Sequence, residues 1–254
     1  KPEGVHILSS PVEKQRAFEE WRLPRYADRT RAFLKVQDGC NSFCSYCIVP
    51  YARGRNRSLP LERVVSQARE LSAQGYQEVV LTGIHLGTYG EDLLPSQSLL
   101  TLLQALEGEK GNFRLRLSSL EPVEFNPPLV AFLARSSMIC PHFHIPLQNG
   151  DDRILKRMNR NYSAAFFADL VEGLARSIPR VAIGADVIGG FRGEDESSFQ
   201  NTLNLIEQLP ISYLHVFPFS RRKGTPAAAF PAQVPSPVTR GRCQALRELG
   251  EKKR

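Results

Sequence analysis

The sequence predicts an α/β fold, built as a partial (β/α)6 barrel of the TIM type with a helical extension at its C-terminal end. Three observations predict it. Short strand-like runs alternate with helix-like stretches from about residue 30 onward. Each strand leads into a polar or glycine-rich loop, as barrel strands do. A loop carrying three cysteines follows the first strand, at the end where barrels place their chemistry.

Six strands are predicted, at residues 33–36, 78–83, 113–119, 142–147, 181–188 and 213–218. The helices between them are predicted at residues 61–74, 97–107, 127–135, 151–158, 163–176 and 195–208. The helix at 61–74 has the clearest signals, because Pro60 precedes it, an apolar stripe runs along one side and Gly75 follows its end.

The two ends of the chain lack this alternation. Residues 1–29 predict a linker or strap that enters the domain, with a short helix between Pro11 and Trp21. Residues 224–237 are rich in Pro and Ala and predict an extended segment, which a helix at 238–253 follows. We therefore expect a strap at 1–29, a barrel core at 30–234 and a C-terminal helix within 235–254.

The composition limits where the protein works and what it binds. The 254 residues are 42% hydrophobic and 23% charged, enough for one sizeable core, and no run of about 18 apolar residues predicts a membrane span. Five cysteines without a disulfide framework favour a reducing cytoplasm. The net charge of +7 favours a polyanionic partner such as nucleic acid, although it also fits a role in solubility alone.

The most specific signal of chemical function is a cluster of three cysteines, Cys40, Cys44 and Cys47, with the spacing C-x3-C-x2-C. A closed structural zinc site needs a fourth ligand nearby, and the next histidine is His85, far along the chain. Three thiolates on one loop therefore favour a metal or cluster site with one open position, where a substrate or cofactor binds. The alternative is three inert buried cysteines.

A glycine-rich segment, residues 82–90, follows the second strand. It lacks the Gly-Lys-Ser/Thr ending of a phosphate-binding loop. It therefore predicts either a close backbone approach to a small cofactor or a plain tight turn. We expect its His85 to be a hydrogen-bonding or core residue rather than a metal ligand.

Polar side chains also follow the third and fourth strands. Residues 118–121 offer two hydroxyls and a carboxylate, either for a ligand or for capping. His142 and His144 alternate along one strand and so point to the same face, but two ligands alone are too few for a metal. Gln148 is the better candidate for a ligand contact, and Asp151 is expected to cap the next helix.

Two basic segments are candidates for contact with RNA. Arg53 and Arg55 flank a glycine in what we expect to be an extended segment, which suits phosphate contacts or a solvated loop. Arg221 and Arg222 belong to residues 217–225, where aromatic and basic residues interleave as single-stranded bases prefer. A serine hydrolase is not supported, because the sequence has no G-x-S-x-G elbow.

Together these segments resemble the radical S-adenosylmethionine (SAM) methylthiotransferases over nearly all of the chain from about Thr30 onward. Residues 81–87, Leu-Thr-Gly-Ile-His-Leu-Gly, resemble the branch that acts on N6-threonylcarbamoyladenosine in tRNA. The fold implied is the radical SAM type of partial barrel. The matching segments are residues 35–58, 78–90, 117–124, 142–161, 183–194 and 214–226.

The resemblance implies that the three cysteines hold a 4Fe–4S cluster whose fourth iron SAM chelates. An electron from the cluster would split SAM into methionine and a 5′-deoxyadenosyl radical, which takes hydrogen from carbon 2 of the adenine. Implied partners are the tRNA anticodon stem-loop and an electron donor of the flavodoxin or ferredoxin type, and we expect a monomer. The implied cofactor-binding residues are Tyr46, Gly83, Gln148, Asp186 and Ile188.

The chain departs from the family in two respects. It has Gly189 and Arg192 where the family usually has Val and Pro. Because an apolar side chain and a rigid turn are lost, the family pattern does not predict the packing there. We also expect the family's N-terminal domain, with its auxiliary cluster, and its C-terminal RNA-binding module to lie outside this chain. The chain should then bind cluster and SAM without completing sulfur insertion. The alternatives are the isopentenyladenosine branch, the branch that modifies a ribosomal-protein aspartate, and a non-catalytic, metal-stabilised RNA-binding module.

Overall fold

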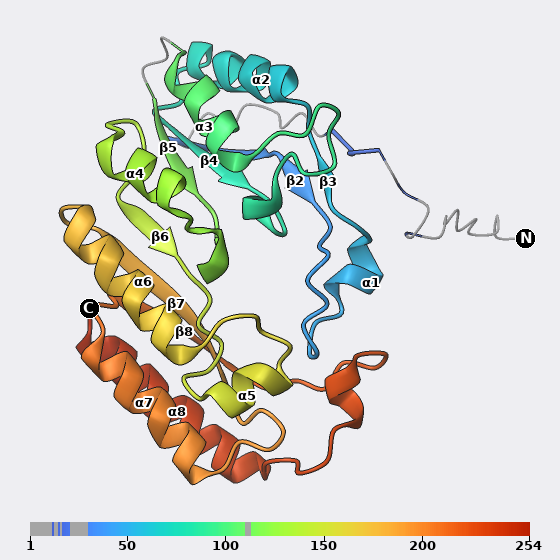
Figure 1. Ribbon diagram of the computed structural model, residues 1–254, viewed down its shortest axis with the longest axis vertical. Coiled ribbons are helices and arrows are strands. Elements are labelled where there is room, and N and C mark those ends of the chain that lie inside the picture. The colour runs from blue at the N-terminus through green and yellow to red at the C-terminus, as the bar shows by residue number, and fades with distance from the viewer. Residues whose placement is uncertain (1–11, 13–14, 16, 21–29, 110–112) are drawn as a thin grey trace, which may run out of the picture.

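Six parallel strands form the centre of the molecule, in a computed structural model that describes residues 12, 15, 17–20, 30–109 and 113–254 (Figure 1). They form two three-stranded sheets, ordered β1-β4-β5 and β6-β7-β8. One isolated parallel bridge, Leu115 with Ile139, joins β5 to the segment that leads into β6. The strands therefore follow one another in chain order around a partial barrel, which confirms the predicted fold class.

All six predicted strands are present. They are β1 (Arg31–Lys35), β4 (Glu78–Thr82), β5 (Arg114–Leu117), β6 (His142–His144), β7 (Ala182–Gly189) and β8 (Tyr213–Pro218). The predicted helices are also present, as α2 (Leu61–Ala73), α3 (Leu99–Glu107), α4 (Pro127–Arg135), α5 (Asp152–Arg157), α6 (Ala164–Ser177), α7 (Glu196–Gln208) and α8 (Ser236–Lys252). The side chain of Asp151 accepts a hydrogen bond from the Ile154 N–H at 3.1 Å, which confirms it as the N-cap of α5.

Alternation along the strands separates an apolar outer face from a polar inner one. In β7, Ile183, Ala185 and Val187 pack into the main core with the surrounding helices, while Asp186 lies on the opposite face. The same pattern puts His144 inward and Phe143 outward in β6. The inner faces of β6 and β7 therefore carry His144 and Asp186, and the helices form a layer outside the strands (Figure 1).

One local prediction is wrong, and a second is mostly untested. The segment expected to be extended around Arg53 instead begins with a five-residue helix, α1 (Val49–Arg53), with Pro50 in its first turn. Its neighbours form a small antiparallel pair, β2 (Gln37–Asp38) with β3 (Arg57–Ser58). The helix predicted between Pro11 and Trp21 lies mostly outside the described residues, and residues 17–20, which are described, are not helical. None of the described helices is long and apolar enough to cross a membrane.

Candidate metal centre at the carboxyl ends of the strands

The three clustered cysteines lie on the loop between β2 and α1, at the carboxyl end of β1. Gly39 precedes them with φ of 77°, and a side chain there would collide with the Arg55 carbonyl oxygen, so the turn needs glycine. Cys44 is buried, Cys40 and Cys47 are partly exposed, and all three are free thiols. Burial and the neighbouring Cys44 and Cys40 raise the pKa of the Cys47 thiol, so negative charge on those two sulfurs opposes a thiolate at Cys47.

The C-terminal half of the chain holds this loop in place. The Ser45 N–H donates to the Met158 carbonyl at 2.9 Å, and the Ala227 N–H donates to the Ser45 carbonyl at 2.8 Å. The Tyr46 ring packs edge-on against Phe191, with 6.4 Å between ring centroids. Ile154, Met158, Phe191 and Ala227 form the small apolar cluster under this contact. The loop is thus positioned by α5 and by the segments that follow β7 and β8.

His85 is the nearest basic group to the first thiol. Its Nδ1 lies 3.4 Å from Cys40 Sγ, and its Nε2 lies 2.5 Å from Glu124 Oε1. Burial alone would lower the pKa of His85, because it disfavours a charge on the ring. The contacts with Cys40 and Glu124 outweigh burial and raise this pKa to about 10. Burial likewise raises the pKa of Cys40, but the hydrogen bonds from His85 and the Ser42 N–H outweigh it and hold that pKa below its usual value. A protonated His85 therefore favours the thiolate form of Cys40.

Arg160 is the basic group beside the second thiol. Its Nη1 donates to Cys44 Sγ at 3.2 Å, and its Nη2 pairs with Glu121. The Arg160 Nε donates to the Tyr162 hydroxyl at 3.1 Å, which fixes the guanidinium plane. Burial raises the pKa of Glu121 despite the arginine beside it. Arg160 is one of three neighbouring basic residues in the sequence, and nothing there distinguishes it as the cation at the thiol.

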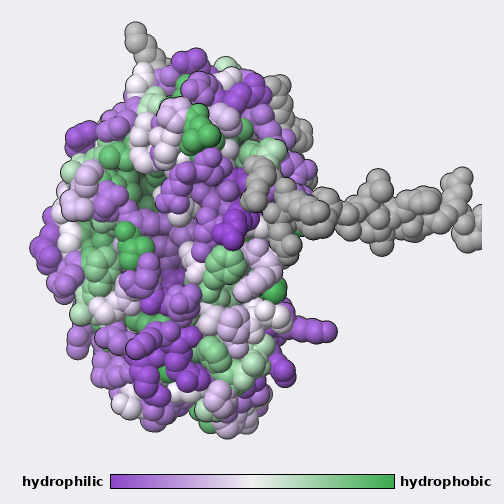
Figure 2. Space-filling view, turned by 45° about the vertical axis from the view of Figure 1, so that its right-hand side comes forward, coloured by the Kyte–Doolittle hydropathy of each residue, from purple (hydrophilic) through white to green (hydrophobic). Residues whose placement is uncertain are grey.

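A cavity of about 480 Å³ opens beside these groups. Cys44, His85, Glu121, Glu124 and Arg160 all line it. With Glu91, which also lines it, the cavity offers one thiol, three carboxylates and two cations to a single ligand. Figure 2 shows one face of the molecule, with hydrophilic side chains gathered across its middle.

The five residues predicted to bind the cofactor do not line this cavity. Gly83 and Ile188 lie at or just after the carboxyl ends of β4 and β7, the same end as the cysteines. A Cβ on Gly83 would lie 2.7 Å from the Gln37 Oε1, so that backbone is closely packed. Gln148 has φ of 65°, and its N–H donates to the Asp186 carbonyl at 2.8 Å. Tyr46 packs under the cysteine loop as described above.

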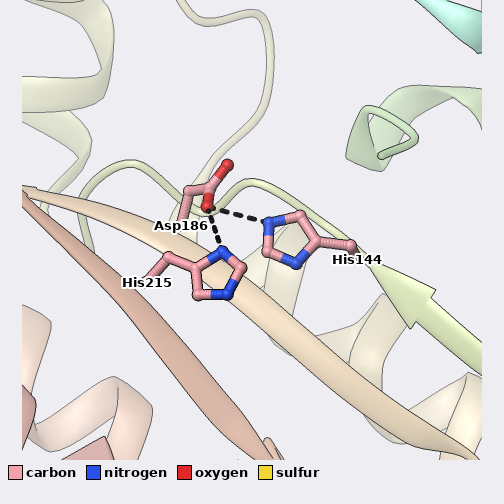
Figure 3. Close-up of side chains that lie close together, drawn as sticks. All are labelled: His144, Asp186 and His215. Carbon is pink, nitrogen blue, oxygen red and sulfur yellow. Dashed lines mark ion pairs between the residues drawn. The ribbon is translucent and has the colours of Figure 1, made fainter. Parts of the chain in front are cut away.

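Asp186 lies inside the barrel, where two histidines contact it (Figure 3). Its Oδ1 is 2.8 Å from His144 Nε2 and 3.4 Å from His215 Nδ1. The Tyr213 hydroxyl lies between the rings of His142 and His144, at 2.9 and 3.3 Å. His142 and His144 thus share a face as predicted, whereas the sequence did not single out His215 or Tyr213. The ligand atoms of His144, Asp186 and His215 lie within 4.8 Å of one another, but the ion pairs already account for the arrangement.

The predicted RNA-contacting arginines have different surroundings. Arg53 makes a two-pronged contact with Asp38, with Nε–Oδ1 and Nη2–Oδ2 distances of 3.1 Å, so it helps to hold the turn before Cys40. Arg55 stacks over the Phe43 ring, 5.9 Å from its centroid. Arg221 and Arg222 are exposed, and neither pairs with an acid among the described residues.

The donor set fits an iron–sulfur cluster. Three free thiols share one loop, with a cation beside two of them, while the other two cysteines lie elsewhere: Cys140 in the bridge before β6 and Cys243 in α8. Thiolate ligation and hydrogen bonds to sulfur are the general features of such clusters. Among the described residues the loop supplies three ligands of its own, so a closed structural zinc site would need His85, whose Nδ1 is already engaged with Cys40 and Ser42, as its fourth.

Comparison with known proteins agrees with this geometry. Residues 34–206 match the model of the radical SAM superfamily. The threonylcarbamoyladenosine tRNA methylthiotransferase MtaB of Bacillus subtilis is 45% identical over 95% of this chain and 54% of its own length. The tRNA-2-methylthio-N(6)-dimethylallyladenosine synthase of Carboxydothermus hydrogenoformans is 38% identical over 98% of this chain and 59% of its own length.

The chain thus spans between half and two thirds of the length of these relatives. Among solved structures, the radical SAM methyltransferase TsrM of Kitasatospora setae, with cobalamin and a [4Fe-4S] cluster bound, superposes with a TM-score of 0.64. The match covers 77% of this chain and 35% of TsrM at 19% identity, which supports the fold alone. Enzymes of the matching superfamily use a 4Fe–4S cluster and SAM. The family model covers most of the barrel and the whole cysteine loop, and the chain belongs to the radical SAM superfamily.

Proposed function

We propose that this chain is the radical-generating core of a tRNA methylthiotransferase, acting on N6-threonylcarbamoyladenosine next to the anticodon. The observation that carries the proposal is the loop of three free thiols beside a charged cavity, at the carboxyl ends of the barrel strands. The choice of nucleoside is supported by the name of the relative that is 45% identical. The whole protein's reaction remains part of the proposal, because the chain spans only 54% of that relative.

In this proposal Cys40, Cys44 and Cys47 hold the 4Fe–4S cluster. When bound, the cluster supplies the electron that cleaves SAM to the radical species used for hydrogen abstraction. The protein's own contribution is electrostatic: His85 and Arg160 each place a cation beside one ligating sulfur. Such contacts lower the cost of gathering thiolates and orient them.

The cavity of about 480 Å³ is the proposed place of the methionine half of SAM. Its three carboxylates, Glu91, Glu121 and Glu124, match an ammonium group, and Arg160 matches a carboxylate. The glycine-rich segment beside it contributes Gly87 and Thr88 to the lining. The adenosyl half keeps the contacts proposed from the sequence: Tyr46, Gly83, Gln148, Asp186 and Ile188.

The first experiment is anaerobic reconstitution with iron and sulfide. We expect a brown protein with about four irons per chain, which under strong reductant converts SAM to methionine and 5′-deoxyadenosine. Cys44→Ala should abolish both properties, whereas Cys140→Ala, which also removes a buried thiol, should keep both. A colourless protein that retains zinc instead would favour the non-catalytic RNA-binding module.

A second experiment addresses the substrate. Anticodon stem-loops that carry either N6-threonylcarbamoyladenosine or N6-dimethylallyladenosine are compared as binding partners of the reconstituted protein. Preference for the second RNA would favour the other tRNA branch, which the relative at 38% identity represents. An electron donor of the flavodoxin or ferredoxin type, a monomeric state and a cytoplasmic location complete the proposal.

A further inference from the structure

A second cavity, of about 340 Å³, lies at the same end of the barrel as the cysteines. The loops that follow β7 and β8 form two of its walls, and the first turns of α8 form the third. Each wall contributes one arginine: Arg192 after β7, Arg221 after β8 and Arg240 on α8. No Asp or Glu is among the described residues that line the cavity.

The positive charge of this cavity is not neutralised by the protein around it. Among the described residues, no carboxylate pairs with any of the three arginines, and Arg192 instead donates to the Phe230 carbonyl and to Gln233 Oε1. Arg242, only two residues after Arg240, shows the contrast. It is buried and paired with Glu194 and Glu196, at 3.0 and 3.1 Å. Charges that gather without an acid repel one another, and an anionic ligand relieves that cost.

The start of α8 adds to the positive potential of the cavity. The 17-residue helix has no acidic residue in its first turn, and no side chain caps it. Its free N–H groups and the positive end of its dipole therefore face the region of the cavity. Ser236 and Thr239, which line the cavity, add hydroxyl donors. Guanidinium, hydroxyl and backbone N–H groups together suit a phosphate, whose several oxygens accept from all three.

We propose that this cavity binds a backbone phosphate of the RNA substrate, next to the nucleotide that enters the barrel. The inference rests on the proposed function and adds a place for the RNA strand. Phe217, at the end of β8 just before the cavity-lining loop, is 51% exposed and offers a ring on which a base stacks. Arg222 and Lys223, which follow Arg221 in the sequence, are exposed and extend the positively charged surface beside the cavity. An acidic peptide would use the cations but not the aromatic ring.

The test measures RNA binding by the reconstituted protein at several salt concentrations. The probe is a synthetic anticodon stem-loop, followed by fluorescence anisotropy. The pocket variant is Arg221→Gln with Arg240→Gln. The matched control is Arg135→Gln with Arg180→Gln, which removes the same charge from two exposed arginines at the opposite, amino ends of β6 and β7. Circular dichroism and thermal unfolding establish that both variants are folded.

We expect the pocket variant to bind on the order of tenfold more weakly than wild type at 0.15 M salt, with a salt slope reduced by about one, since one phosphate contact is lost. The control variant should stay within about twofold of wild type. Equal affinities and slopes for the two variants would overturn the inference, as would competition by poly-glutamate as strong as competition by unlabelled stem-loop. SAM cleavage by wild-type protein without RNA tests the proposed function separately, so the two ideas fail independently.

Discussion

At the scale of single residues, the structure explains how this chain tolerates Gly189. The family resemblance places a branched apolar residue here, and its loss leaves a gap that another side chain must fill. A Cβ built on Gly189 would lie 2.9 Å from Cys243 Sγ, and Cys243 is itself buried in α8. The thiol therefore occupies the space, and the two positions are coupled through one contact.

This coupling predicts the outcome of a double-mutant cycle. Gly189→Ala should lower the free energy of unfolding by about 1–3 kcal/mol, because the new methyl group overpacks a filled site. In a Cys243→Ala background the same change should cost much less. Gly173→Ala is the control, since nothing lies within 4 Å of a Cβ there and the change in mid-helix should stabilise α6 by roughly 0.5–1 kcal/mol. Urea unfolding of the four proteins gives the coupling energy, and a value near zero would contradict the account.

At the scale of elements, three strands meet around one carboxylate. Glu78 at the start of β4 is almost fully buried and contacts Arg31 of β1 and Arg114 and Arg116 of β5, at 3.1, 2.7 and 2.6 Å. Burial raises the pKa of Glu78, but the hydrogen bonds from Arg116 and Arg114 outweigh it, so the pKa lies below the ordinary value of 4.5. The ionised form of one residue thus holds the amino ends of three neighbouring strands together.

Stability should therefore fall in acid through Glu78. Because its pKa is lower in the folded state, its contribution is present above about pH 4.5 and is lost as the pH falls through the folded-state value. Glu78→Gln should cost about 2–3 kcal/mol at pH 7, since it leaves three cations without their anion. The difference from wild type should shrink below pH 4. Glu172→Gln, which breaks an exposed pair with Arg176, should cost less than about 0.5 kcal/mol at any pH. A Glu78→Gln deficit that does not change with pH would contradict this.

The cysteine loop is a second case in which several elements act on one site. Phe191 follows β7 and contacts Tyr46 of the loop, Phe219 after β8 and Phe230 after η4 (Pro226–Ala229). It is fully buried. The position of the three cysteines therefore depends on packing that lies about 150 residues away in the sequence.

Phe191→Leu should reduce the iron bound on reconstitution, because the loop loses the surface against which Tyr46 packs. The loss of stability should be on the order of 1–2 kcal/mol. Phe167→Leu removes the same atoms from an equally buried ring on α6, so it should cost similar stability and leave the iron content unchanged. Iron and sulfide assays on both variants decide the matter. Equal iron loss in the two variants would mean that iron binding depends on overall stability and not on the contact between Phe191 and Tyr46.

The elements predicted from sequence are those with their own local signals. The helix predicted at 127–135 has its observed bounds, and in the structure Asn126 caps it and Pro127 begins it. α1 was missed because five residues are too few to show a period, and β2 and β3 because two residues each carry no alternation. The pairs His85–Glu124 and Arg160–Glu121 each join residues 39 apart. Such contacts depend on how neighbouring loops meet, which no local pattern encodes.

At the scale of the whole molecule, the two sheets share one apolar core. A single apolar core includes Leu81 of β4 and Leu115 of β5 from one sheet, and Phe143 of β6 and Val187 of β7 from the other. The cysteine loop adds a second connection, since it follows the first sheet's edge strand and bonds to Met158 and Ala227 in the C-terminal half. The two sheets are therefore parts of one domain, although a single isolated bridge joins them near β5 and β6.

This predicts one cooperative unfolding transition for the protein, in which the calorimetric and van't Hoff enthalpies agree. Leu115→Ala is the decisive variant, because Leu115 lies at the junction and is fully buried. It should cost about 2–5 kcal/mol and move the whole transition to lower temperature without splitting it. Reconstitution with iron and sulfide should raise the transition temperature of both proteins, since the ligands are positioned only when both halves are folded. If the sheets were separate folding units, Leu115→Ala would shift one of two resolved transitions and leave the other in place.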